Sequence, residues 1–405
     1  MASRYIARTY KVLTKNGLPI IINHAKGSKF FDIHGNGYLD ATSSYSSANF
    51  GHCHEHFKKV LNTQIENIAL CPRFLENENL NKLGLTVNTY FRNKINVSNN
   101  KNLQIILGSD GSTSVDAAIK IARAWGSLNK MIEIGKTRQI FVKGNFHGRS
   151  FGSLSVSDHP YQQKFYPKVP GLSIVPYNDI PSLVREISQD DVTAVIVEPI
   201  QGEGGIIVPS SDYLRNIRQL CDKYNVLMIC DEIQTGLFRT GSLLCSEQFD
   251  TKPDIAIIGK SLGGGYLPIS LCVGSEDVMS SIKQGEHGNT FGGNPLASGM
   301  AISVLEYVHD NNISSTVAKL SNIFSSNLKS LKYPFIKEIR GMGLFFGIEF
   351  DEKISSDNVA NNLVEYGILT KGTAKNTIRL TPPFVITNTE IEELFDGLNK
   401  CFKTL

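Results

Sequence analysis

The chain has 405 residues, of which 41% are hydrophobic and 20% charged, and its formal net charge is +3. This length predicts one large domain with a smaller companion, and the balanced charge argues against a nucleic-acid binder. No apolar run reaches the roughly 20 residues needed to span a bilayer, so no membrane association is expected. The 7 cysteines form no CxxC pair. Dispersed cysteines indicate free thiols in a reducing compartment and favour the cytoplasm.

The predicted elements change in style along the chain. Residues 20–42 alternate short apolar runs with Lys-Gly-Ser and Gly-Asn-Gly turns, which is typical of a small meander. From about residue 100 strand-like runs alternate with helical patterns. The strand-like runs cover residues 103–107, 139–144, 193–199, 225–232 and 254–260, and the helical patterns cover 111–126 and 213–224. This alternation predicts an α/β fold with a mostly parallel sheet and helices on both faces.

The last hundred residues change style again. A long helical stretch near residue 300 leads into a segment of mixed helices and strands. We therefore predict a large domain over residues 46–299. Residues 1–45 and 300–405 are expected to form a smaller α+β domain together.

Three central strands run into polar side chains. Glu203 follows the strand at 193–199, Asp231 and Gln234 follow the next, and Lys260 ends the strand at 254–260. Because parallel strands end at the same edge of a sheet, where such sheets bind ligands, these groups are expected to cluster. Taken alone, Lys260 would more often point to solvent and Asp231 would more often cap a helix. Their combination favours a cofactor site.

Pyridoxal 5′-phosphate requires both groups. Its aldehyde condenses with a lysine amine, and its ring nitrogen stays protonated beside a buried carboxylate. Its phosphate needs backbone N–H donors at the start of a helix. The candidates are Lys260, Asp231 and the stretch Gly111-Ser112-Thr113, which opens the helical pattern at 111–126.

The chain also resembles a known family, the class III (subgroup II) aminotransferases among the fold-type I pyridoxal-phosphate enzymes. The matching stretches run in family order: SSYSSANFGHCH (43–54), GNFHGRS (144–150), VEPIQGEGG (197–205), DEIQTGLFRTG (231–241), IIGKSLGGGYLPIS (257–270), GEHGNTFGGNPLA (285–297), RGMGL (340–344) and IRLTPP (378–383). The resemblance implies a seven-stranded, mostly parallel sheet flanked by helices and a smaller domain from both termini. It also implies a homodimer with shared active sites.

The resemblance assigns roles around the cofactor. Lys260 would bind the cofactor covalently and move the proton between substrate and cofactor. The other cofactor contacts implied are Asp231 to the pyridine nitrogen, Gln234 to the phenolic oxygen, Phe146 stacked on the ring, Gly111 and Ser112 at the phosphate, and Thr290 at the phosphate of the neighbouring subunit. Without the resemblance, Thr290 would be interpreted as a turn residue in GNTFGGN.

Two stretches, YSSANFGHCH and GEHGNTFGGNP, are most similar to the ornithine-specific members of the family, which implies ornithine as amine donor and 2-oxoglutarate as acceptor. Arg149 would hold the remote carboxylate of 2-oxoglutarate. Arg379 would hold its α-carboxylate, and Glu203 would mask Arg379 while ornithine is bound. Tyr45 matches the tyrosine that selects ornithine over 4-aminobutyrate (GABA). N-acetylornithine, GABA and lysine remain alternative donors.

Some features depart from the pattern. Asp110 would place a carboxylate near the cofactor's phosphate, which supports the alternative of a non-enzymatic homologue that binds the cofactor poorly. Lys15 aligns with a tyrosine that contacts the α-carboxylate of ornithine. The stretch Gly51-His52-Cys53-His54 could suggest a metal site. However, alternating residues on an extended chain point to opposite sides and no second ligand cluster is visible, so no metal is predicted.

Overall fold

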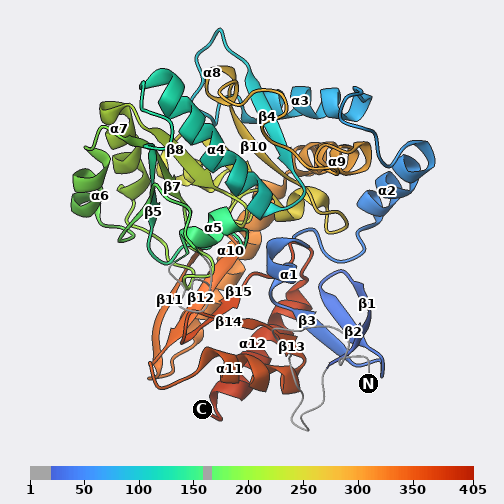
Figure 1. Ribbon diagram of the computed structural model, residues 1–405. Helices are drawn as coiled ribbons and strands as arrows, with labels where there is room; N and C mark the ends of the chain where they lie inside the picture. The colour runs from blue at the N-terminus through green and yellow to red at the C-terminus, as the bar shows by residue number, and fades with distance from the viewer. Residues whose placement is uncertain (1–19, 158–166) are drawn as a thin grey trace.

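The computed structural model describes residues 20–157 and 167–405. Figure 1 shows a larger part above and a smaller part below, in which blue N-terminal strands lie beside orange and red C-terminal segments. The predicted role of Lys15 falls outside the described residues. No helix in the described ranges combines the length and the apolar character needed to cross a membrane.

The larger part is organised around a seven-stranded sheet with the order β4-β10-β9-β8-β7-β5-β6. The strands are β4 (Leu103–Gly108), β5 (Arg138–Val142), β6 (Leu172–Val175), β7 (Val192–Val197), β8 (Leu227–Asp231), β9 (Ile255–Ile258) and β10 (Ser270–Ser275). Strands β6, β5, β7, β8 and β9 run parallel, and β10 is antiparallel to both of its neighbours. The predicted mostly parallel seven-stranded sheet is confirmed.

Helices cover both faces of this sheet because its central strands are apolar on both sides. Alternate strand residues belong to different clusters. One cluster joins Val195 and Val197 to the helices α6 (Ile180–Ile187) and α7 (Tyr213–Tyr224). The other joins Ala194 and Ile196 to α4 (Gly111–Asn129). The helices α3 (Glu78–Phe91) and α9 (Pro295–Asp310) pack beside β9 and β10.

The smaller part contains two four-stranded sheets. One has the order β1-β2-β3-β13 and the other β11-β12-β15-β14. The strands are β1 (Ile22–Lys26), β2 (Lys29–Asp32), β3 (Gly37–Asp40), β11 (Ile336–Met342), β12 (Phe345–Phe350), β13 (Ile368–Leu369), β14 (Lys371–Thr373) and β15 (Thr377–Leu380). Because β3 pairs with β13, the two ends of the chain share one sheet. The domain boundaries after residues 45 and 299 stay a prediction.

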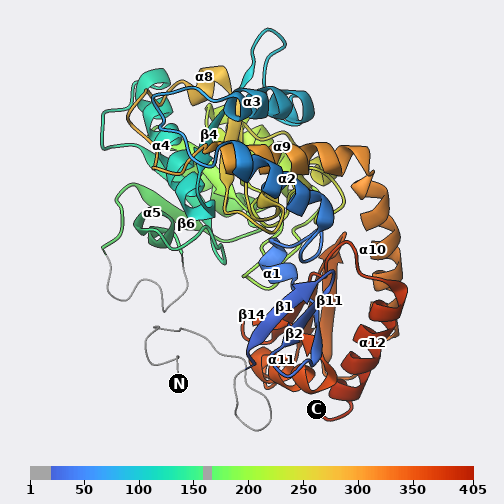
Figure 2. The same ribbon diagram turned by 90° about the vertical axis from the view of Figure 1, so that its right-hand side faces the viewer.

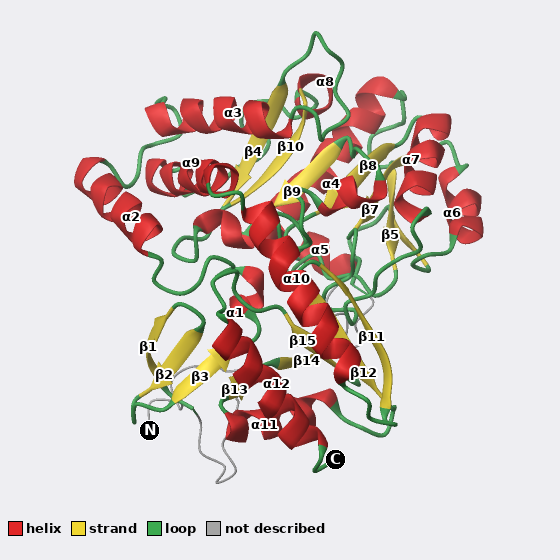
Figure 3. Ribbon diagram, turned by 180° about the vertical axis from the view of Figure 1, so that it is seen from behind, coloured by secondary structure: helices red, strands yellow, loops and turns green. Residues whose placement is uncertain are grey.

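Several helices complete the fold, and α10 (Ile313–Ser330) runs from the larger part down onto the smaller one in Figures 2 and 3. The others are α2 (Glu55–Asn67), α5 (Phe151–Ser155), α8 (Glu276–Met279), α11 (Ser356–Leu363) and α12 (Asn388–Phe402), with a left-handed turn at α1 (Ser43–Ser46) and 3-10 turns at η2 (Cys245–Phe249), η3 (Lys260–Gly263) and η4 (Val364–Tyr366).

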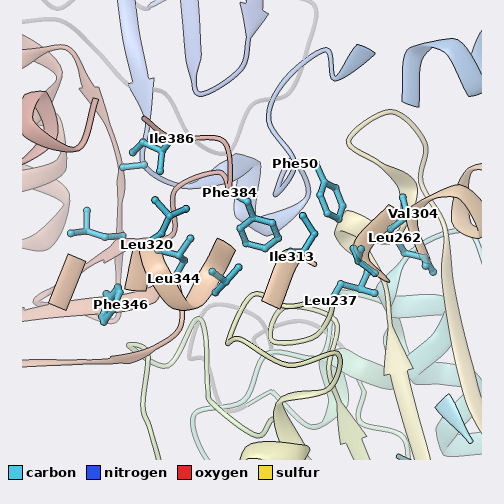
Figure 4. Packing of buried hydrophobic residues seen from close by; sticks show 14 of the residues in the cluster. Phe50, Leu237, Leu262, Val304, Ile313, Leu320, Leu344, Phe346, Phe384 and Ile386 are labelled. Atoms are coloured by element: carbon cyan, nitrogen blue, oxygen red, sulfur yellow. The ribbon is translucent and has the colours of Figure 1, made fainter. Parts of the chain in front are cut away.

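The hydrophobic core is continuous between the two parts. A single cluster of buried side chains includes Ile258 and Leu262 from the larger part and Phe346 and Phe384 from the smaller part. Figure 4 shows Phe50 close to Phe384 where the two parts meet, and their ring centroids lie 5.7 Å apart. The site described next therefore lies on a packed scaffold.

Candidate active site

A cavity of about 310 Å³ opens where β8 and β9 end and α4 begins. It brings together most of the residues that the sequence predicts for the cofactor. Its lining is Asp110, Gly111, Ser112, Phe146, His147, Gly148, Arg149, Glu198, Asp231, Ile233, Gln234, Thr235 and Lys260. The predicted cluster of a carboxylate, an amide and an amine at one edge of the sheet is present in this cavity.

Lys260 follows β9, a strand that is almost completely buried. The four residues of β9 are at most 1% exposed, and Lys260 begins the turn η3 with a φ of 49°. Burial lowers the pKa of the Lys260 amine to about 8, although Glu203 acts in the opposite direction. Near pH 7 most of the amine is still protonated, but a fraction of roughly one tenth is neutral and can act as a nucleophile.

Asp231 is the last residue of β8 and does not cap a helix. One carboxylate oxygen, Oδ1, accepts from the backbone N–H of Ile233 at 3.1 Å, and Oδ2 lies 2.6 Å from Nδ1 of His147. Burial opposes protonation of His147, but the hydrogen bond to Asp231 and the negative charges of Asp231 and Glu198 together outweigh it, so the pKa of the imidazole is raised. The pair fixes the orientation of the Asp231 carboxylate inside the cavity.

Two buried groups beside Asp231 were not predicted to have a role. His147 is 2% exposed, and Glu198 is 5% exposed. Glu198 accepts from the backbone N–H groups of Phe146 at 2.8 Å and Gly202 at 3.2 Å. Burial raises the pKa of Glu198 to about 7. The sequence does contain a signal for Glu198, because this residue directly follows a buried strand. Lys260 has a similar position, separated from the end of its strand by a single glycine.

The first turn of α4 contributes to the wall of the cavity. Gly111 and Ser112 are its first residues, and first-turn amides lack acceptors within their own helix. Asp110 is the N-cap, and its Oδ1 accepts from the backbone N–H of Thr113 at 3.0 Å. The Asp110 carboxylate therefore turns toward its own helix, yet it still contributes to the cavity wall.

Arg379, on β15, is fully buried and pairs with Glu203. Its Nη2 lies 2.7 Å from Oε1 of Glu203. Burial opposes ionisation of Glu203, but Arg379 holds the pKa of this carboxylate below its ordinary value. Neither residue lines the cavity, but Gly202, the neighbour of Glu203, lies against the side chain of Gln234 in the cavity wall. The sequence-predicted pair of Glu203 and Arg379 is brought together.

Tyr45 lies above this ion pair. Its ring centroid is 5.6 Å from the guanidinium carbon of Arg379 and 5.1 Å from Nζ of Lys371. Tyr45 belongs to a turn, Ser43–Ser46, whose φ angles are 46°, 48°, 61° and 67°. Each non-glycine residue in this left-handed region costs roughly 1–2 kcal/mol. The surrounding structure must therefore hold the turn in place.

Arg149 and Phe146 lie together at the cavity, with the guanidinium carbon 5.6 Å from the ring centroid of Phe146. Tyr45, Glu203, Arg379 and Thr290 are not among the residues lining this cavity. Arg379 contacts both Tyr45 and Glu203, whereas Thr290 is exposed in a loop. Within one described chain, Thr290 is therefore not assembled with the other predicted residues.

The two histidines of the stretch at 51–54 have separate partners. His52 Nε2 lies 2.8 Å from Oδ2 of Asp40, whereas His54 Nε2 lies 3.2 Å from the hydroxyl of Tyr307. Across residues 20–157 and 167–405 there is no group of three or more His, Cys, Asp or Glu residues arranged to hold a metal ion.

Comparisons with known proteins agree with this geometry. The family model for class-III aminotransferases matches residues 10–402. The chain is 41% identical to ornithine aminotransferase 1 of Staphylococcus aureus over 387 residues, which is 95% of each chain. Its fold is similar to that of an ornithine aminotransferase from Toxoplasma gondii with pyridoxal phosphate partially occupying the active site, with a TM-score of 0.92, 35% identity and coverage of 99% and 92%. It is also similar to an acetylornithine aminotransferase from Elizabethkingia anophelis, with a TM-score of 0.85, 32% identity and coverage of 100% and 97%.

Proposed function

This chain belongs to the class-III aminotransferases, and we propose that it transfers the δ-amino group of L-ornithine to 2-oxoglutarate, giving glutamate 5-semialdehyde and glutamate. The observation that carries the proposal is the ion pair between the buried Arg379 and the partly exposed Glu203, with the ring of Tyr45 against the guanidinium. The enzyme must accept a diamine in one half-reaction and a dicarboxylate in the other. An arginine that a neighbouring carboxylate can cover serves both requirements.

The residues of the cavity fit pyridoxal phosphate. Gln234 supports the fit, because its Nε2 is a buried donor without a hydrogen-bond partner among the described residues. This amide is available for the phenolic oxygen, Asp231 for the ring nitrogen, and the first turn of α4 for the phosphate. When bound, the cofactor supplies an electron sink for the negative charge that develops at the substrate carbon.

Lys260 and Asp231 would carry out complementary tasks. The Nζ atom of Lys260 would take a proton from the δ-carbon of ornithine and hold it for the return transfer, because its pKa of about 8 suits transfer in both directions. The Asp231 carboxylate, oriented by His147 and by the N–H of Ile233, would hold the ring nitrogen in its protonated form. Phe146, in the wall of the same cavity, would pack against the ring.

Substrate carboxylates would be held by arginines, whose planar forks form two parallel charge-assisted hydrogen bonds. Arg379 takes the α-carboxylate of 2-oxoglutarate after Glu203 moves away. Arg149 takes the remote carboxylate. While ornithine occupies the site, Glu203 stays on Arg379 and leaves the δ-amine as the reacting group.

A related amine donor is the second candidate. Similarity to an acetylornithine aminotransferase at 32% identity favours N-acetylornithine among the alternatives, with GABA and lysine behind it. The relatives named as ornithine aminotransferases include one at 41% identity in sequence and one at 35% among the solved structures, and these similarities support ornithine.

We also propose that the chain forms a homodimer in which Thr290 reaches the cofactor phosphate bound by the partner subunit. Thr290 is exposed next to Phe291, which is 58% exposed, and Phe74 is 84% exposed. Large apolar side chains left exposed in this way are suited to an interface between subunits.

All seven cysteines are free, which supports a cytoplasmic location.

A single-turnover experiment tests the proposed donor. The cofactor absorbance band of the holoenzyme is followed after mixing with ornithine, N-acetylornithine, GABA or lysine at equal concentrations. We expect ornithine to bleach the band at least about tenfold faster than the others, because unpaired polar groups penalise the wrong substrates. Faster bleaching by another donor would replace ornithine as the substrate.

A further inference from the structure

The left-handed segment Ser43–Ser46, which we call the Tyr45 turn, is held from two sides by side chains that lie outside the cavity. We propose that Asp40 and Arg239 are positioning residues that hold Tyr45 over Arg379 and thereby set the preference for ornithine over GABA. This inference rests on the proposed function and adds a structural cause for its substrate selectivity.

Asp40 holds the turn from its N-terminal side. This carboxylate has no exposed surface and uses both of its oxygens. Oδ1 accepts from the backbone N–H of Thr42 at 2.8 Å and from its hydroxyl at 2.7 Å. Oδ2 accepts from the backbone N–H of Ser44 at 3.1 Å and contacts Nε2 of His52 at 2.8 Å. This single buried carboxylate thus holds the backbone at Thr42, just before the Tyr45 turn, and at Ser44 within it.

Arg239 holds the turn from the other side. It is fully buried, and its Nη1 donates to the carbonyls of Leu344 and Pro382, each at 2.9 Å. Its Nη2 donates to the hydroxyl of Ser43 at 3.2 Å and to the side chain of Asn49. The guanidinium therefore joins the Tyr45 turn to the residue before β12 and to the segment that follows β15.

A second link ties the same turn to the strand that carries Arg379. The hydroxyl of Ser43 donates to the carbonyl of Thr381 at 2.7 Å, and the hydroxyl of Thr381 donates to the carbonyl of Thr42 at 3.0 Å. Thr381 lies two residues after Arg379. The distance between the Tyr45 backbone and the Arg379 backbone is consequently set by these contacts.

Side-chain packing does little to place Tyr45 itself. Its side chain is 45% exposed, and its ring contacts the cations of Arg379 and Lys371. A tyrosine that is not enclosed by the core takes its position from its backbone. Because a left-handed run of non-glycine residues persists only when the surroundings impose it, loss of these contacts should let the ring move away from Arg379.

The test uses Ser43→Ala, which removes the hydroxyl shared by Arg239 and Thr381 without leaving a buried charge unpaired. Asp40→Asn tests the other side. We expect the KM for ornithine to rise about tenfold with kcat within about twofold, and the ornithine-to-GABA ratio of kcat/KM to fall about tenfold. Ser47→Ala, a neighbouring serine outside the turn, serves as the matched control and should leave both values unchanged. If Ser43→Ala or Asp40→Asn lowers the melting temperature but leaves the ornithine-to-GABA ratio of kcat/KM unchanged, the proposal is overturned.

A double-mutant cycle with Tyr45→Ile separates positioning from a general structural effect. If Ser43 acts through Tyr45, Ser43→Ala should not lower the ornithine-to-GABA ratio further once the tyrosine is absent. A full additional loss in the Tyr45→Ile background would contradict the proposal. If Asp40→Asn does not fold, Ser43→Ala decides the question.

Failure of the proposed function gives a different result. In that case the wild-type enzyme itself prefers another donor, and the same variants are assayed for the ratio between that donor and ornithine. A crystal structure of Ser43→Ala gives an independent readout. We expect Tyr45 to leave its left-handed conformation, and an unmoved Tyr45 would refute the proposed role of the turn.

Discussion

Glu203 covers Arg379 with its carboxylate, Oε1 lying 2.7 Å from Nη2, at a point where the guanidinium has no exposed surface. Removing the partly exposed Glu203 leaves the buried charge of Arg379 without compensation, and such changes have large effects. Changing this pair should therefore affect the two half-reactions to different extents, which can be measured.

Replacing Glu203 with alanine should impair the reaction with ornithine more than the reaction with 2-oxoglutarate. The guanidinium of Arg379, no longer covered by Glu203, would then attract the carboxylate of ornithine and misplace its δ-amine. We expect at least about a tenfold loss in the ornithine half-reaction and less than about threefold in the other, measured by single-turnover kinetics. Glu338→Ala, which removes an exposed partner of Arg340, is the control. Equal losses in both halves would argue against masking.

The pKa of Lys260 predicts how fast the cofactor-free protein captures pyridoxal phosphate. Burial lowers this pKa to about 8, and only the neutral amine has the lone pair that attacks an aldehyde. The capture rate, followed by the new absorbance band, should rise with pH and level off above about 8. Lys260→Ala should stay folded by circular dichroism and give no band at any pH. A band in that variant would remove Lys260 from this role.

Asp110 is expected to weaken retention of the cofactor. Its carboxylate caps α4 at the wall of the same cavity and would repel a phosphate held by the first turn. Asparagine caps helices equally well but carries no charge, so Asp110→Asn should slow cofactor release about fivefold without lowering stability. Release is measured by trapping the free cofactor. Asp179→Asn, which alters the N-cap of α6, is the matched control, and unchanged release in Asp110→Asn would exclude this electrostatic effect.

Glu198 should make the cofactor-free protein less stable as the pH rises toward neutrality. Burial raises its pKa from 4.5 to about 7, so between these values the folded state keeps a proton that the unfolded chain has lost. Its contribution is fully present below pH 4.5 and is lost as the pH passes through 7. The free energy of unfolding of the wild type should fall between about pH 5 and 7.5. In Glu198→Gln this fall should be smaller by roughly 2 kcal/mol.

Chemical denaturation at several pH values measures this change. Glu392→Gln, which alters an exposed glutamate on α12, should follow the wild-type curve. If Glu198→Gln follows it as well, Glu198 does not titrate in this range.

The parts of the site that sequence reasoning could reach are those fixed by strand ends. Asp231 and Lys260 lie at the ends of parallel neighbours, so the edge of the sheet brings them together whatever the details of the loops. The pattern did not reveal β6 or β10. Strand β6 has four residues at the edge of the sheet, and β10 begins and ends with serine and contains a glycine, so neither has a strong apolar signature.

Other features depend on contacts between distant residues. His147 gains its role only because its loop folds onto Asp231, 84 positions later. The Tyr45 turn contains no glycine, and its left-handed backbone results from Asp40 and from Arg239, which is 196 positions away from Ser43. Local preferences of serine and tyrosine would predict a different conformation there.

The buried cluster that joins Ile258 to Phe384 also has a consequence for how the chain can be divided. Cutting it near residue 300 would expose apolar faces on both fragments, because each supplies a large share of the same packed interior. The two parts should therefore melt together in a single cooperative transition, and neither should persist as an independently expressed fragment.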